Sequence, residues 1–307
     1  MKRFNLLILL VLSFLLAFGT VSSVVAAPSN AQASVNVTPE QWAGHSFTFL
    51  ALPYDKQAAG YEIFTVAQAD LGFNGDQSVR IPYEKHVGKQ ATVSQVIPYP
   101  AGPGQREYMV YMTVKETGQK LVGRTMRGQL EGLVLSDDLK KAKQQFLGKT
   151  IYPKFRELSG LYIPGSNENP PAVSIPIGSP VKVVDVYAGN QSQEPIWLVV
   201  SVNGQKAVLP IAYSWTNIPV AYWTEAKPWQ DALFIEDPRL TLGWSHTLWY
   251  QIETASVETG MTKGQVLLSW GKPMRSEAND SVWVYENKKL NFSGDIVHSI
   301  ESISSNP

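Results

Sequence analysis

Cysteine is absent from the 307 residues, which excludes disulfide bonds, thiolate metal sites, a cysteine nucleophile and lipid attachment through cysteine. Histidine is scarce, and the four His residues show neither HExxH nor HxH spacing, which argues against a zinc hydrolase. An excess of charge is also lacking, because 26 basic side chains balance 26 acidic ones and provide no field to hold nucleic acid. We therefore expect no cofactor, no metal ion and no nucleic-acid partner.

The length and the 44% hydrophobic content suit two or three domains with packed cores. At the N-terminus, two basic residues precede an apolar run, Leu6–Phe18, and Ala31 and Ala33 complete a cleavage site. This pattern predicts a signal peptide over residues 1–33 and an exported, periplasmic protein. The alternatives are secretion, or an uncleaved segment that anchors the chain and makes its only membrane contact.

An internal repeat runs through the mature chain. Gly88, Val93 and Val96 recur as Gly178, Val183 and Val186, and the Gly-Gln-Lys of 118–120 returns at 204–206. Each copy alternates valine with polar residues, continues into a β-branched and aromatic strand, and then turns at a glycine. Short strands and tight turns predict small closed β-barrels of five to six strands.

The repeat resembles tandem bacterial SH3-like modules over about 46–130 and 148–222. We therefore expect a first barrel with a leading helix in 34–135, and a helix and second barrel in 136–225. Thr38–Gln41 carries the cap, proline and glutamine of the first helix start. Ser136, Asp137 and Asp138 are expected to cap the second helix.

The segment 257–273 contains a further helix start and stop. Thr262 and Gln265 form a capping box, Gly271 suits a left-handed C-terminal turn, and Pro273 forbids continuation of the helix. An earlier stripe repeating every four residues from Trp244 predicts another helix, and three alternating segments come after the capped one. We expect an α+β domain over 226–307 with two helices and a three-stranded antiparallel sheet.

Gly260-Met261-Thr262, Gln265-Val266, Gly271-x-Pro273 and Trp283-x-Tyr285 resemble the SmpA/OmlA (BamE-like) family over roughly 230–303. This resemblance implies an envelope protein that contacts other proteins, as an outer-membrane protein assembly factor or as a protein inhibitor. Family members at the outer membrane carry a lipidated cysteine after the signal, and this chain has none.

Aromatic side chains are the candidate binding residues, because aromatic rims line the grooves of such barrels. The candidates are Tyr54, Tyr61, Tyr99 and Tyr108 in the first copy, Tyr152, Tyr162 and Tyr187 in the second, and Tyr222, Trp223 and Trp229 in the linker after it. The alternative for all of them is ordinary surface or packing between domains.

No catalytic constellation is evident. Ser245 and His246 are sequence neighbours without a GxSxG elbow, and the acid pair Glu236-Asp237 lies at an expected helix start. The sequence thus predicts a mainly β, non-enzymatic scaffold that binds envelope proteins or peptidoglycan.

Overall fold

The computed structural model describes residues 36–102, 105–126, 128–161 and 170–303. The expected signal peptide over 1–33 and the candidate Tyr162 lie outside the described residues. The described chain is mainly β and is built from curled antiparallel sheets. None of its described helices has both the length and the apolar composition that a membrane crossing requires.

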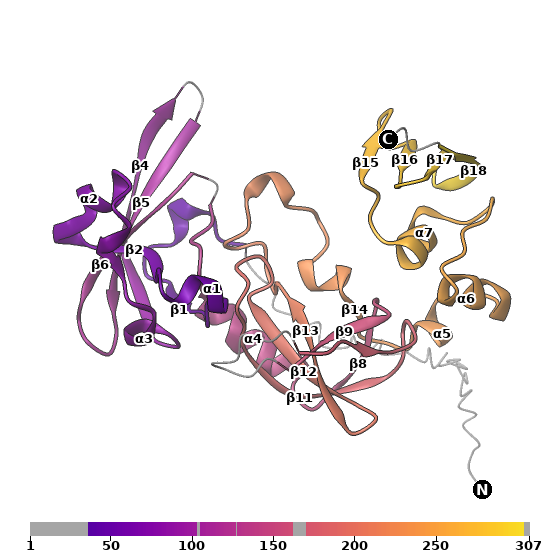
Figure 1. The fold of residues 1–307 in the computed structure, drawn as a ribbon, viewed down its shortest axis with the longest axis horizontal. Helices are drawn as coiled ribbons and strands as arrows, with labels where there is room; N and C mark the ends of the chain where they lie inside the picture. Colours follow the sequence, from indigo (N-terminus) through magenta and orange to yellow (C-terminus); the bar gives the residue numbers. More distant parts are fainter. Residues whose placement is uncertain (1–35, 103–104, 127, 162–169, 304–307) are drawn as a thin grey trace, which may run out of the picture. The chain divides into compact units, whose positions relative to one another are not determined.

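The first module is a seven-stranded sheet that comes after a short 3₁₀ turn, η1 (Pro39–Gln41) (Figure 1). Its strands are β1 (Ser46–Phe49), β2 (Tyr61–Thr65), β3 (Arg80–Ile81), β4 (Gln90–Gly102), β5 (Gln105–Val114), β6 (Lys120–Thr125) and β7 (Leu133–Leu135). They lie in the order β3-β2-β6-β5-β4-β1-β7. The connections contain α1 (Tyr54–Gln57), η2 (Val66–Gln68), α2 (Ala69–Phe73), η3 (Gln77–Val79) and α3 (Tyr83–His86).

Helix α4 (Ser136–Phe146) leads into the second module, which is also a seven-stranded sheet. Its strands are β8 (Thr150–Pro153), β9 (Glu157–Gly160), β10 (Val173–Ser174), β11 (Val181–Ala188), β12 (Ile196–Val202), β13 (Gln205–Ile211) and β14 (Leu233–Phe234). They lie in the order β10-β9-β13-β12-β11-β8-β14. The long connection from β13 to β14 contains η4 (Val220–Tyr222) and η5 (Pro228–Asp231).

The two sheets therefore share one strand order, displaced by seven strands. The recurring glycines occupy equivalent places: the Gly88 N–H donates to Phe49 O at 2.9 Å, and the Gly178 N–H donates to Pro153 O at 2.8 Å. Both glycines have positive φ, +74° and +69°. An L side chain is strained at positive φ, which explains why glycine occupies this turn in each copy.

The sheets also differ from the small closed barrels expected from the sequence. Each has seven strands, and within the described residues the end strands of each, β3 and β7 or β10 and β14, do not pair with each other. Strand β14, the counterpart of β7, pairs with β8, and Trp229 packs in the core of the second module. Residues 228–234 therefore belong to that module, although the sequence pattern predicts a boundary at 225.

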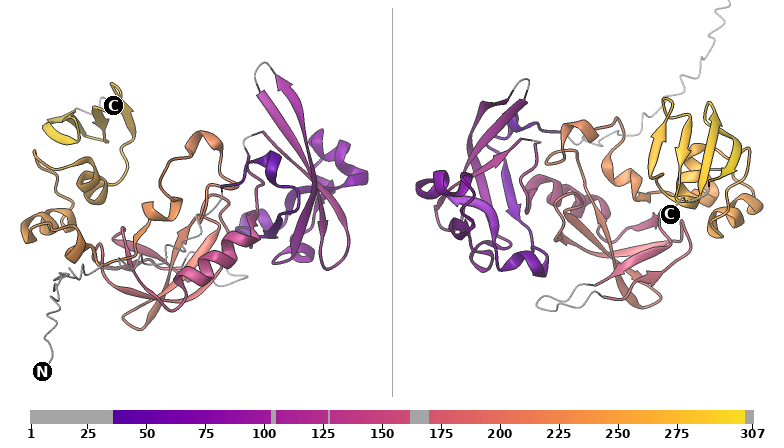
Figure 2. Two further views of the ribbon diagram at one scale, coloured as in Figure 1. Left: turned by 180° about the vertical axis from the view of Figure 1, so that it is seen from behind. Right: turned by 45° about the horizontal axis from the view of Figure 1, so that its top comes forward.

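The last domain contains three helices and four strands (Figure 2). The helices are α5 (Pro238–Thr241), α6 (His246–Glu253) and α7 (Lys263–Trp270), and the strands are β15 (Arg275–Glu277), β16 (Val282–Val284), β17 (Lys288–Ser293) and β18 (Ile296–Ser302). Trp249 and Ile252 of α6 and Val266 of α7 share a core with Trp283 and Leu290, so both helices pack on the sheet. The sequence predicts only two helices and three strands here, so α5 and β15 are additional to the expected elements.

The helix ends of this domain obey the sequence rules. The Thr262 side chain accepts a hydrogen bond from Gln265 N at 3.2 Å, and Gln265 Oε1 accepts from Thr262 N at 2.8 Å. Gly271 ends α7 with φ +78°, and Asp237 caps α5 by accepting from Arg239 N at 2.9 Å. The capping box and the Asp237 cap are confirmed.

Asp138 is a different case. It lies in the first turn of α4, but its carboxylate accepts a hydrogen bond from the Ser214 hydroxyl at 2.5 Å instead of capping the helix. The expected cap by Ser136, Asp137 and Asp138 is therefore wrong: Leu135 holds the N-cap position of α4 and no side chain caps it. The second module brings a buried hydroxyl to the Asp138 carboxylate instead.

Candidate binding groove

An open groove of about 780 Å³ brings together four segments that are far apart in the sequence. It is lined by Thr38, Pro39, Glu40, Arg106, Tyr108, Met126, Gly128 and the four residues 219–222. These residues come from η1 and η4 with the residue before each, from β5 and from the connection between β6 and β7, so both modules contribute. Its lining includes two of the aromatic candidates, Tyr108 and Tyr222.

Buried hydrogen bonds hold the walls of the groove in place. Val37 N donates to the Thr216 hydroxyl at 2.9 Å, which ties the chain before η1 to the connection that carries η4. Asn217 Oδ1 accepts from Leu130 N at 2.5 Å, and its amide donates to Leu133 O at 2.7 Å. Since a buried amide with these partners leaves little freedom, the groove is preformed.

Large apolar side chains are exposed along the groove. Met126, Val220 and Tyr222 are 56%, 53% and 64% exposed, respectively. Exposed apolar residues that line one concave surface are typical of a binding site, whereas single scattered ones are normal on any protein surface.

A polar cluster forms another part of the lining. The Tyr108 hydroxyl donates to Glu40 Oε1 at 2.5 Å. This hydrogen bond, aided by burial, raises the pKa of Tyr108. Burial alone would raise the pKa of Glu40, but the bond from Tyr108 and further hydrogen bonds outweigh it and lower that pKa. Glu40 is thus a fixed carboxylate at neutral pH, and Arg106 lies nearby as a cation.

The other aromatic candidates are dispersed. Tyr61 and Trp229 are buried in the cores of the first and second modules, so neither reaches a surface rim. Tyr61 donates to Leu50 O at 2.5 Å, and Trp229 packs edge-on against Phe146. For these two residues, packing replaces the expected rim role.

Four further candidates are half-buried. Trp223 comes directly after η4 and donates from Nε1 to Ile218 O at 2.9 Å, which places it beside the groove residue Tyr222. Burial and a hydrogen bond to Glu107 raise the pKa of Tyr99 to about 12.

The half-buried candidates of the second module lie on its strands. Tyr152 lies on β8 opposite Phe234, and the Tyr187 ring lies 5.7 Å from that of Trp197. The remaining described candidate, Tyr54, is exposed at the start of α1.

Sequence reasoning missed Met126, Val220, Glu40 and Arg106. Nothing in their spacing relates them, because they meet only through the packing of the two modules. Ser245, which precedes His246 in the sequence, is a helix cap: it caps α6 by accepting from Leu248 N at 3.2 Å. In the described ranges, no group of three or more His, Asp or Glu side chains is arranged to hold a metal ion.

Comparison with protein-family models, with curated proteins and with solved structures finds no match for this chain.

Proposed function

We propose that this chain is a non-enzymatic, exported scaffold of the cell envelope, in which two SH3-like modules bind an extended peptide segment of another envelope protein. The observation that carries this proposal is the groove, where exposed Met126, Val220 and Tyr222 lie on walls tied together by buried hydrogen bonds. A preformed concave surface loses little conformational entropy when a ligand binds, which favours affinity.

The lining favours a peptide over a glycan strand. Met126 and Val220 are aliphatic and offer no hydrogen bond to sugar hydroxyls, but they suit apolar side chains. Pro39 and Pro219 add further apolar surface, and Glu40 provides a fixed acceptor for a donor of the ligand. An extended segment that alternates apolar and polar residues matches this arrangement.

In this proposal, the last domain is BamE-like and contacts a protein partner. Its order of helices and then an antiparallel meander supports that assignment, and so does the capping box of α7. Leu240 and Met274 are 82% and 74% exposed, which leaves apolar surface for a partner.

The test is selection of peptides by the full chain from a randomised library, and then titration of the enriched peptides. Tyr222→Ala removes a large exposed ring from the groove, so we expect at least about tenfold weaker binding. Tyr250→Ala is the matched control, because Tyr250 is 68% exposed on α6 and does not line the groove.

Two outcomes would contradict the proposal. One is a selection that enriches no peptide above background. The other is a set of enriched peptides whose Kd is the same for the Tyr222→Ala variant and the unmodified chain.

A further inference from the structure

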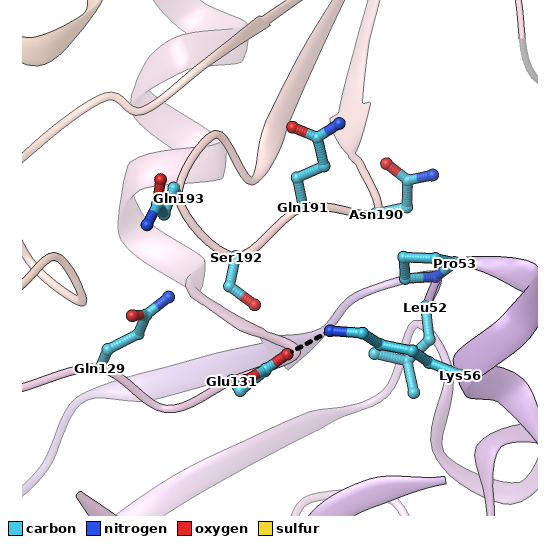
Figure 3. A pocket seen from close by; sticks show the side chains of 9 residues that line it. All are labelled: Leu52, Pro53, Lys56, Gln129, Glu131, Asn190, Gln191, Ser192 and Gln193. Atoms are coloured by element: carbon cyan, nitrogen blue, oxygen red, sulfur yellow. Dashed lines mark hydrogen bonds and ion pairs between the residues drawn. The ribbon is translucent and has the colours of Figure 1, made fainter. Parts of the chain in front are cut away.

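A second cavity, of about 340 Å³, lies where the first module meets the loop between β11 and β12 of the second (Figure 3). The first module contributes Leu52, Pro53, Lys56, Gln129 and Glu131, and the loop contributes residues 190–193. This cavity shares no lining residue with the peptide groove. Its chemistry is also different, because side-chain amides dominate its lining.

The amides of this cavity have unused hydrogen-bonding capacity. Among the described residues, the side-chain amides of Gln129, Gln191 and Gln193 make no hydrogen bond, although the Gln129 backbone N–H donates to the Thr125 hydroxyl at 3.0 Å. Asn190 Oδ1 is buried and has no protein donor within the described chain. This oxygen is closed off from solvent, so the amides available to a ligand are those of Gln129, Gln191 and Gln193, of which Gln191 and Gln193 are exposed.

Charge in the cavity is balanced. Lys56 Nζ lies 2.6 Å from Glu131 Oε1, and Figure 3 shows this pair at one side of the cavity. The hydrogen bond to Glu131 and the attraction of its charge raise the pKa of Lys56. With one cation paired to one anion, the site offers no net attraction for a phosphate or a carboxylate.

The walls of the cavity are held together by hydrogen bonds between the modules. Ala51 N donates to Gly189 O at 3.1 Å, and Gly132 N donates to the Ser192 hydroxyl oxygen at 2.8 Å. Because the Ser192 oxygen accepts this bond, its own proton remains available for a ligand. The cavity is therefore preorganised and polar.

We infer that this cavity binds a neutral, hydroxyl-rich ligand of about the size of one sugar ring. Hydroxyl groups both donate and accept, and so do the amides that line the cavity, whereas an anion would only accept. Pro53 and Leu52 supply a small apolar surface that suits the C–H face of a sugar ring. The volume lies at the lower end of the range for small-molecule sites.

The experiment is a ligand-observed NMR titration of the full chain. N-acetylglucosamine and glucose are the neutral probes, and glucuronate and glucose 6-phosphate are the charged ones. We expect the neutral probes to bind and the double variant Gln191→Ala/Gln193→Ala to weaken their binding about tenfold or more. Gln144→Ala is the matched control, since Gln144 is exposed on α4 and does not line the cavity.

Stronger binding of the charged probes would overturn the inference, as would equal binding by the double variant and the unmodified chain, or no binding of either neutral probe. Tyr222→Ala separates this site from the peptide groove. It should leave sugar binding unchanged, so either proposal can fail while the other survives.

Discussion

At the scale of one residue, Asp138 shows how burial changes the pKa of a carboxyl group. It is 4% exposed, the Ser214 hydroxyl donates to it, and Thr216 N donates to the same Ser214 oxygen at 3.1 Å. Burial raises the pKa of Asp138 to about 6, and this effect outweighs the hydrogen bond from Ser214 and the charge of Lys141, which lower it. The neighbouring Asp137 raises it slightly further.

This pKa predicts the pH dependence of stability. Between about pH 6 and pH 4 the folded state holds a proton that the unfolded state releases, so Asp138 adds stability as the pH falls through 6. We expect Asp138→Asn to reduce the gain in unfolding free energy between pH 7 and pH 5, measured by urea denaturation at each pH.

Asp137→Asn is the control for this prediction, because Asp137 is exposed at the adjacent position of the same helix. Its pH profile should match that of the unmodified chain. A profile of Asp138→Asn that also matches the unmodified chain would show that the carboxyl of Asp138 titrates normally.

At the scale of elements, the connection between β13 and β14 is the main difference between the two copies of the repeat. It spans residues 212–232, whereas the connection between β6 and β7 spans 126–132. The longer connection carries Thr216 and Asn217 to the first module and places η4 in the peptide groove. A single insertion-like difference thus both joins the modules and builds a wall of the candidate site.

Asn217 is the test of this connection. It has φ +65° and makes three hydrogen bonds to Leu130 and Leu133, so Asn217→Ala combines backbone strain with three lost bonds. We expect a loss of about 3 kcal/mol or more in unfolding free energy. Asn203→Ala isolates the backbone component, because Asn203 has φ +49° in the exposed turn between β12 and β13.

The Asn203→Ala variant should lose only about 1 kcal/mol by the same urea denaturation. Equal losses for the two variants would mean that the hydrogen bonds of Asn217 contribute nothing measurable.

Some elements could be predicted from local pattern. The strands around Val93 and Val183 and the capping box of Thr262 depend on neighbours within a few residues, so spacing alone was sufficient. Strand β15, Arg275–Glu277, was missed because all three residues are exposed and charged or polar, and only pairing with β16 makes them a strand. The groove could not be predicted either, because its residues meet only through contacts between segments that are far apart in the sequence.

At the scale of the whole described chain, each module places the residue six positions after the start of its first strand beside the unit that comes next in the sequence. Leu52, six residues after the start of β1, lines the cavity formed with the second module. Arg156 occupies the equivalent place after β8 and donates to the carbonyls of Ile252 and Glu253 at the end of α6. Of these two equivalent residues, Arg156 bonds the next unit, whereas Leu52 packs in the core of the first module and lines the cavity.

The paired glycines test this docking. Gly88 and Gly178 share a left-handed backbone, but a Cβ at Gly88 would meet nothing within 4 Å, whereas one at Gly178 would lie 2.8 Å from Pro238 Cγ of α5. We expect Gly88→Ala to lower the unfolding free energy by about 1 kcal/mol and Gly178→Ala by about 2 kcal/mol or more. Both are measured by urea denaturation of the full chain.

If Gly178→Ala costs no more than Gly88→Ala, then the contact with Pro238 is too loose to hold the last domain. A larger loss for Gly178→Ala, accompanied by easier proteolysis of the chain after Phe234, would show that the contact couples the two units.

The sequence by itself determined the repeat, its turns and the helix ends, because glycine at positive φ and side-chain caps act between residues close in the chain. Only the tertiary structure decided which aromatic candidates share a surface: it buried Tyr61 and Trp229 and brought Tyr108 and Tyr222 into one groove. The physical reason is that burial and contact depend on how the modules pack, which joins residues more than a hundred positions apart.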